Sequence, residues 1–185
     1  MSDLEKHDVY RLRDFTKPLY DIKDTMHDWS HINRCFLAVQ RVIQVNSQQC
    51  DMMALIGGLV LHGVIYEEGM DARVNEFLSD KVSGSEIAKI ILVSWDSQKE
   101  SRPETLEGGI LHDAHLLEGD DNFLITKTLV TGTARGQKLN QTVKFFFEHV
   151  ATLKPLYYFD TTKSEYENRL NRAKKFFSSL RRFTD

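Results

Sequence analysis

The sequence feature that most constrains the fold is the apolar segment at residues 50–66, which contains the run MMALIGGLVLHG. Its apolar side chains would point in every direction around a helix, which is typical of a helix buried at the centre of a bundle. Asp51 is placed to cap the start of this helix. Gly57 and Gly58 lower helix propensity by about 1 kcal/mol each relative to alanine, and they favour the close approach of another helix. The segment therefore predicts an all-α bundle built around one central helix.

Helical periodicity recurs along most of the remaining chain. In residues 31–46, apolar side chains recur at three- and four-residue steps, and Ser30 is the predicted N-cap. Residues 123–130 (FLITKTLV) are rich in β-branched side chains and have strand propensity, so their structure stays open. Residues 131–136 predict a flexible loop. Further helices are predicted at residues 71–79, 84–95, 103–118, 138–153 and 163–183.

The length and composition fit one globular domain. The chain has 185 residues, 41% of them hydrophobic and 28% charged. Its formal net charge of −3 gives no reason to expect a nucleic acid or a membrane as partner. Cys35 and Cys50 have no CxxC spacing, which fits free thiols in a reducing compartment. With no signal-peptide pattern and no apolar stretch of about 18 residues, we expect a cytoplasmic or nuclear protein that is not secreted. The oligomeric state is not predictable from the sequence.

Three potential metal ligands lie on separate predicted helices. His31 opens the helix at residues 31–46, and His62 is the first strongly polar side chain of the central segment. Asp113 lies within the helix at residues 103–118. In an antiparallel bundle, the start of one helix and the end of the next meet at the same end. A single histidine on an apolar face is more often a core residue, but these three together predict a metal site.

Three motifs resemble the HD-domain metal-dependent phosphohydrolases, in particular their small stand-alone type. They are HDWSHINR at residues 27–34, LVLHG ending at Gly63, and PETLEGGILHDAH at residues 103–115. The resemblance implies a single-domain HD-type helical bundle at residues 25–183, preceded by an N-terminal helical extension at residues 1–24. It also implies metal-assisted hydrolysis of phosphate esters, often of nucleotides.

Carried over position by position, the resemblance implies that His31, His62 and Asp113 are metal ligands. Gly63 stands where the family has the aspartate of its HD pair, and glycine has no side chain to coordinate a metal. Two imidazoles and one carboxylate would hold one divalent transition-metal ion, namely Mn, Fe, Co, Ni or Zn. Magnesium and calcium prefer oxygen ligands and fit this set less well.

Two further positions depart from the family's pattern. Residues 93–98 (VSWDSQ) lack a histidine that family members often have there, and His115 stands where the family has a second aspartate. His115 is one possible substitute ligand. Glu67, about one turn beyond the central segment's histidine, is the other, although an exposed charge at a helix end is the commoner role.

Several neighbouring residues are candidates for phosphate binding or for support of the ligands. Arg34 follows His31 by one helical turn, so it could contact a phosphate or brace a carboxylate. His27 and Asp28 precede the same helix and are possible hydrogen-bond partners of a ligating histidine. The acidic cluster at residues 118–121 is interpreted as a solvated turn.

The sequence thus predicts an HD-domain phosphohydrolase-like protein. Its ancestral hydrolysis of a nucleotide or other phosphate ester would be weakened or lost because Gly63 replaces the aspartate. One alternative is an active phosphohydrolase with a metal site formed by His31, His62 and Asp113. A further alternative is a non-catalytic helical module that binds a ligand or a protein. Whether the chain is an enzyme stays open at this point.

Overall fold

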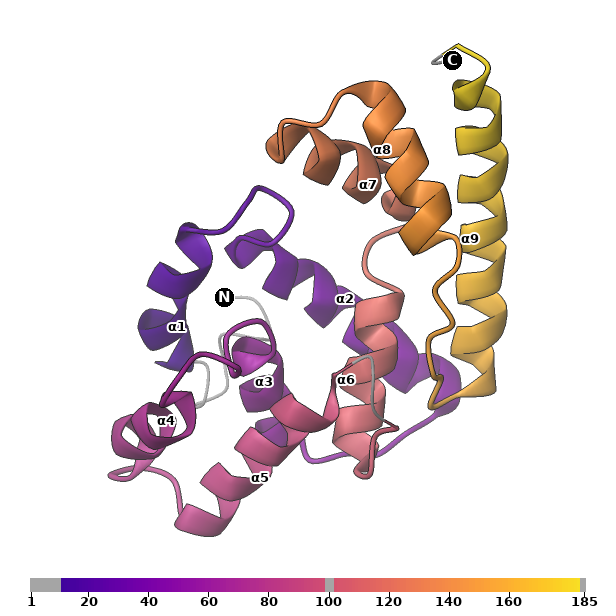
Figure 1. Cartoon of the computed structure of the whole chain (residues 1–185). Coiled ribbons are helices and arrows are strands. Elements are labelled where there is room, and N and C mark those ends of the chain that lie inside the picture. Colours follow the sequence, from indigo (N-terminus) through magenta and orange to yellow (C-terminus); the bar gives the residue numbers. More distant parts are fainter. Residues whose placement is uncertain (1–10, 99–101, 184–185) are drawn as a thin grey trace.

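The computed structural model describes residues 11–98 and 102–183, and every regular element in these ranges is a helix (Figure 1). This confirms the predicted all-α bundle. Residues 1–10 of the predicted N-terminal extension lie outside the described residues. No helix in the described ranges is long and apolar enough to cross a membrane. The helices are α1 (Leu12–Asp21), α2 (Trp29–Asn46), α3 (Met52–Leu61), α4 (Met70–Leu78), α5 (Gly84–Asp96), α6 (Leu106–Leu116), α7 (Phe123–Ala134), α8 (Leu139–Phe145), the π-helical turn η3 (Phe146–Val150) and α9 (Asp160–Arg181).

α3 lies at the centre of the bundle, as its apolar pattern predicts. Residues 54–61 are all buried, and α3 contacts α1, α2, α5 and α6. The two glycines of α3 allow α5 to approach closely. A methyl group on Gly57 would come within 2.7 Å of Ile90 Cγ2, and one on Gly58 would come within 2.6 Å of Val93 Cγ1. The predicted close helix–helix contact at these glycines is therefore confirmed.

Side-chain caps fix where α2 and α3 begin. The carboxylate of Asp51 accepts hydrogen bonds from the backbone amides of residues 53 and 54, so the predicted cap of α3 is confirmed. The predicted cap of α2 is wrong. Asp28 caps this helix by accepting a hydrogen bond of 2.9 Å from the amide of Ser30, which lies inside the first turn. An aspartate reaches the free amides of the first turn as well as a serine does, and here it stands one residue before the helix.

α3 ends at Leu61, before the predicted end at residue 66, because a tyrosine hydroxyl occupies the end of its hydrogen-bond ladder. Tyr20 on α1 donates to the carbonyl oxygen of Val60 over 3.1 Å and accepts from the amide of Gly63 over 2.9 Å. Burial raises the pKa of Tyr20, which keeps its hydroxyl protonated. A Cβ atom at position 63 would lie 2.8 Å from the Tyr20 ring. Position 63 therefore requires glycine for as long as α1 is packed there.

Residues 123–134 form α7, so the strand propensity of residues 123–130 is overridden. The prediction of a flexible loop at residues 131–136 is wrong for most of its length. Thr128 donates its hydroxyl to a carbonyl one turn earlier over 2.7 Å, which satisfies a β-branched polar residue inside a helix. Gly132 is buried, and a methyl group there would come within 2.3 Å of Thr142 Oγ1 on α8. This glycine serves helix packing, a role that its neighbours in the sequence do not indicate.

α9 runs along one side of the molecule, with α7 and α8 beside one of its ends (Figure 1). Tyr166, Leu170, Ala173 and Phe177 form its buried stripe, within the helix predicted at residues 163–183. Phe146 of η3 stacks on Phe177 with a centroid distance of 4.2 Å. These contacts place α7, η3 and α9 around the end of α6, where the candidate site lies.

Candidate metal centre and adjoining cavity

Three histidines from separate elements meet near the centre of the bundle. His31 lies in the first turn of α2, His62 directly follows α3, and His115 lies in the last turn of α6. One nitrogen from each ring lies within 4.8 Å of the other two. His31 and His62 are buried and His115 is half-buried. The structure therefore brings together two of the predicted ligands and one of the predicted substitutes.

The hydrogen bonds of Ser97 fix the orientation and the proton of His62. The Ser97 hydroxyl donates to the carbonyl oxygen of Ser94 over 2.6 Å, so it can only accept from His62 Nδ1, which lies 2.7 Å away. The proton of the neutral imidazole is therefore on Nδ1, and Nε2 carries the lone pair. That Nε2 atom lies 2.7 Å from His115 Nδ1. His115 consequently donates to His62, and a metal ion bound here would replace the shared proton.

A buried carboxylate orients His31 in the same way. Glu118 Oε1 accepts from His31 Nδ1 over 2.9 Å and from Arg34 Nε over 2.7 Å. Its Oε2 accepts from Lys127 Nζ over 2.7 Å. An ionised carboxylate only accepts hydrogen bonds, so His31 carries its proton on Nδ1 and keeps the lone pair on Nε2. Cys35 Sγ, 3.5 Å from His31 Nδ1, completes a second group of possible ligands with Glu118.

The pKa values agree with this arrangement of protons. Burial would raise the pKa of Glu118, but the hydrogen bond from His31 and the hydrogen bond and charge of Lys127 hold it well below its usual range. Burial lowers the pKa of His31, which keeps this imidazole neutral. Glu118 is only 4% exposed, so the interpretation of residues 118–121 as a solvated turn is wrong at this residue.

Asp113 is not in the histidine group, although it is completely buried. Its two oxygens accept hydrogen bonds from the backbone amides of Tyr158 and Phe159 over 3.0 Å and 2.9 Å. His112 Nδ1 is a further partner at 2.9 Å. Asp113 and His115 are two positions apart on α6, so they point to different sides of the helix. Asp113 holds the chain segment before α9, and His115 faces the other two histidines.

The remaining predicted site residues lie outside the group of three histidines. Glu67 is half-buried and belongs to none of the groups of possible ligands in the described ranges. Asp28 caps α2. Arg34 braces the buried carboxylate and donates to the carbonyl oxygen of Met26 over 2.6 Å, so it serves the support of His31. His27 lines a neighbouring cavity.

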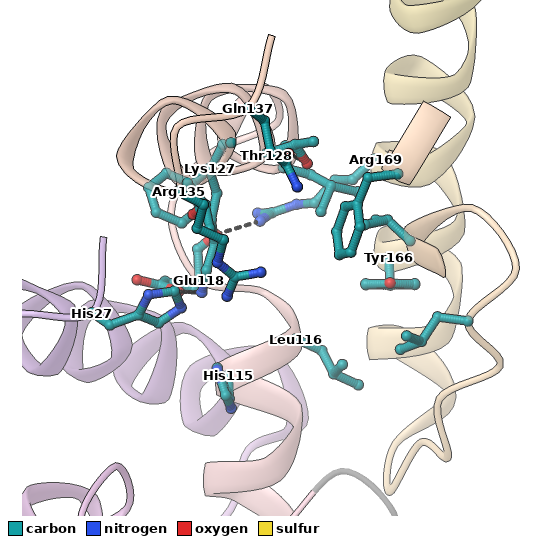
Figure 2. A pocket seen from close by; sticks show the side chains of 17 residues that line it. His27, His115, Leu116, Glu118, Lys127, Thr128, Arg135, Gln137, Tyr166 and Arg169 are labelled. Atoms are coloured by element: carbon teal, nitrogen blue, oxygen red, sulfur yellow. Dashed lines mark hydrogen bonds and ion pairs between the residues drawn. The ribbon is translucent and has the colours of Figure 1, made fainter. Parts of the chain in front are cut away.

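A cavity of about 340 Å³ adjoins the three histidines and shares His115 with them (Figure 2). His27, Lys127 and Arg135 lie on the side of this cavity that is formed by α7 and the start of α2, and Tyr166 lies on the side of α9. The other residues that line it are mostly apolar or hydroxylic: Leu116, Phe123, Leu124, Thr128, Thr131, Gly132, Phe145, Val150 and Leu153, together with Glu118, Gln137 and Arg169.

Two residues that support the histidines, Ser97 and Glu118, are not distinguished by the sequence. Ser97 lies within residues 93–98, which stood out only because they lack the histidine of the resembling family. Glu118 follows His115 by three residues, but two other acids stand beside it and only its burial distinguishes it from them.

Comparisons with models of known families, with curated proteins and with solved structures find no match to this chain. The HD-domain resemblance therefore stays a prediction from the three motifs.

Proposed function

We propose that this chain is an HD-type phosphohydrolase-like protein that binds one divalent transition-metal ion with His31, His62 and His115. The proposal is carried by the hydrogen bonds of two of these residues, which use Nδ1–H for Glu118 and Ser97 and leave the lone pair on Nε2, the atom that in His62 accepts from His115 and would bind the metal in its place. Metal-ligating histidines usually donate their other N–H to such a partner. Of the metals predicted from the sequence, Fe, Ni and Zn suit imidazole donors best, whereas Mn prefers oxygen ligands.

The adjoining cavity is the proposed place of a phosphate ester. An ion held by the histidines would supply Lewis acidity toward a phosphoryl oxygen and toward water. Lys127 and Arg135 make the near wall of the cavity cationic, which favours an anionic ester there. The ester would thus lie beside His115, the residue that the cavity and the histidine group have in common.

The proposed turnover is slow. Within the described ranges, no carboxylate oxygen lies within 4.8 Å of the ligand atoms of all three histidines. Glu118 is ionised but paired with Arg34 and Lys127, so it is a weak base. A well-placed general base typically contributes about 10²–10⁴-fold to a rate, and no carboxylate of the described residues is placed to serve as one. The same observation favours a second candidate function, a module that binds metal and ester without hydrolysing the ester.

Metal binding is tested by dialysing the whole protein against a chelator and then titrating it with Co²⁺ or Zn²⁺ against a competing chelator. We expect one ion per chain, with strongly reduced affinity in His62→Ala and His115→Ala. His149→Ala is the matched control, because His149 is exposed and outside the histidine group. Asp113→Asn should retain the affinity. Equal losses in Asp113→Asn and His62→Ala would contradict the proposed ligand set, as would the absence of binding.

Activity is tested by phosphate release from nucleotides and simpler phosphate esters with added Mn²⁺, Co²⁺ or Ni²⁺. We expect slow, metal-dependent release that His62→Ala abolishes and His149→Ala leaves unchanged. Stoichiometric metal without any release would exclude hydrolysis and leave the binding module.

A further inference from the structure

The cavity beside the histidines has a cationic side and an apolar side, and this combination defines a class of ligand. We propose that it binds a small organic phosphate monoester with a compact aromatic or aliphatic body, and that Arg135 holds the anionic group of this ligand. The choice of phosphate as the anion rests on the proposed function. The charge, size and apolar character of the ligand follow from the cavity itself.

Arg135 is the cation that the fold leaves available. It is exposed at the end of α7, and within the described ranges its guanidinium has no hydrogen-bond or ion-pair partner. Figure 2 shows its side chain pointing into the cavity, on the same side as His27. Lys127, in contrast, is already paired with Glu118. A guanidinium can form two parallel hydrogen bonds with a phosphate, so a free arginine in a cavity is suited to this anion.

Two residues that line the cavity each have a polar atom that is buried from solvent. Among the residues that the structure describes, Arg169 Nε and Thr131 Oγ1 have no hydrogen-bond partner, and both residues line the cavity. Arg169 is only 4% exposed, and its terminal nitrogens already donate to the carbonyl oxygens of residues 117–119. Buried donors without partners are uncommon because they are costly.

The size and the apolar wall limit the body of the ligand. The volume of about 340 Å³ lies near the lower end of the range of about 300–1,000 Å³ that is typical of ligand pockets. Leu116, Phe145, Leu153 and Tyr166 supply apolar surface. Inorganic phosphate alone would leave this surface uncovered, whereas a phenyl or short alkyl group would remove it from water.

The proposal is tested by calorimetric titration of the chelator-treated whole protein with phenyl phosphate and with inorganic phosphate. We expect phenyl phosphate to bind more tightly. Arg135→Gln should weaken both ligands by about tenfold or more, because a hydrogen-bonded charge pair is lost. Arg172→Gln is the matched control, because Arg172 is also an exposed arginine but lies outside the cavity. Unchanged affinity in Arg135→Gln, or tighter binding of inorganic phosphate, would overturn the proposal.

The role of the apolar wall is tested with a second pair of variants. Leu153 and Leu139 are exposed to a similar degree, 45% and 47%, but only Leu153 lines the cavity. Leu153→Gln should weaken phenyl phosphate severalfold and leave inorganic phosphate unchanged, and Leu139→Gln should affect neither. Equal effects of the two variants would overturn the apolar part of the proposal.

Metal titration of the same preparations separates this inference from the proposed function. If Co²⁺ binds but phenyl phosphate does not, the inference fails and the metal centre stands. If phenyl phosphate binds with the expected dependence on Arg135 but Co²⁺ does not bind, the metal centre fails and the ligand site stands.

Discussion

Gly63 has no side chain, and the ring of Tyr20 packs into the space that this leaves. The Tyr20 ring lies 2.8 Å from the place of a Cβ atom at position 63, and its hydroxyl bonds to the backbone on both sides of the end of α3. We expect Gly63→Ala to lower the free energy of unfolding by about 1–3 kcal/mol, because the added methyl group overpacks a buried contact. Urea unfolding measures this change.

The control for that variant is Gly84→Ala. A Cβ atom on Gly84 at the start of α5 would meet no atom of residues 11–98 or 102–183 within 4 Å. Alanine has the higher helix propensity, so this variant should be neutral or slightly stabilising. If the two variants lower the stability equally, the contact with Tyr20 is not the cause.

Ser97 gives a second prediction at the scale of the residue. Ser97→Ala removes the acceptor that holds His62 with its proton on Nδ1. Since loss of such a supporting partner typically costs about 10–100-fold in metal affinity, we expect a loss of that order in the chelator competition assay. Ser94→Ala is the matched control, because the Ser94 hydroxyl is also buried but has no hydrogen-bond partner among the described residues. A loss of affinity in Ser94→Ala as large as in Ser97→Ala would refute the role of Ser97.

At the scale of the element, Asp51 connects the start of α3 to α5. Burial would raise its pKa, but hydrogen bonds from the Ala54 amide and from Lys89 lower it below the usual value. The unfolded chain therefore binds this proton more readily, and its carboxylate stabilises the fold above about pH 4. This contribution is lost as the pH falls through the lowered pKa.

Two substitutions separate the cap from the charge. At pH 7, Asp51→Ala should lower the free energy of unfolding by about 1 kcal/mol, whereas Asp51→Asn retains a good N-cap and should cost less. Between pH 7 and 3, Asp51→Asn should lose less stability than the natural chain, as measured by urea unfolding at several pH values. An identical acid dependence of both chains would show that the charge of Asp51 contributes nothing.

The elements also show how far the sequence determines the structure. The apolar pattern predicts α2, α3 and α9 because their buried stripes are local properties of the chain. The helical structure of residues 123–130 is not determined by their local sequence, because their helix is stabilised by packing against α8 at Gly132. The end of α3 is likewise set by Tyr20, which is distant in the sequence. Such contacts between residues distant in the sequence cannot be predicted from the spacing of apolar residues along the chain.

The same distinction holds for the candidate site. The topology of an antiparallel bundle is enough to predict that His31 and His62 lie close together. The choice between Asp113 and His115 depends on the rotation of α6 about its own axis, which the sequence motif does not reveal. Ser97 and Glu118 come from other elements, and no spacing in the sequence links them to the histidines.

For the whole molecule, the three histidines connect α2, the end of α3 and α6. An ion bound by all three would therefore stabilise the folded chain as a unit. At about 100 times its dissociation constant, the ion should add about 2.7 kcal/mol to the free energy of unfolding and raise the melting temperature by about 5–10 °C. Thermal unfolding with Co²⁺ and with a chelator measures the shift, and His62→Ala should show none. A shift that persists in His62→Ala would place the ion elsewhere.

The contact between Tyr20 and Gly63 also restricts the routes along which this chain can evolve. A carboxylate at position 63 would collide with the Tyr20 ring, so a lineage cannot acquire it in one favourable step. Tyr20 must also be exchanged for a smaller residue, and that exchange removes the hydroxyl that closes the end of α3. The two positions should therefore change together among the descendants of this sequence, and the order of the two changes decides whether the intermediate protein folds.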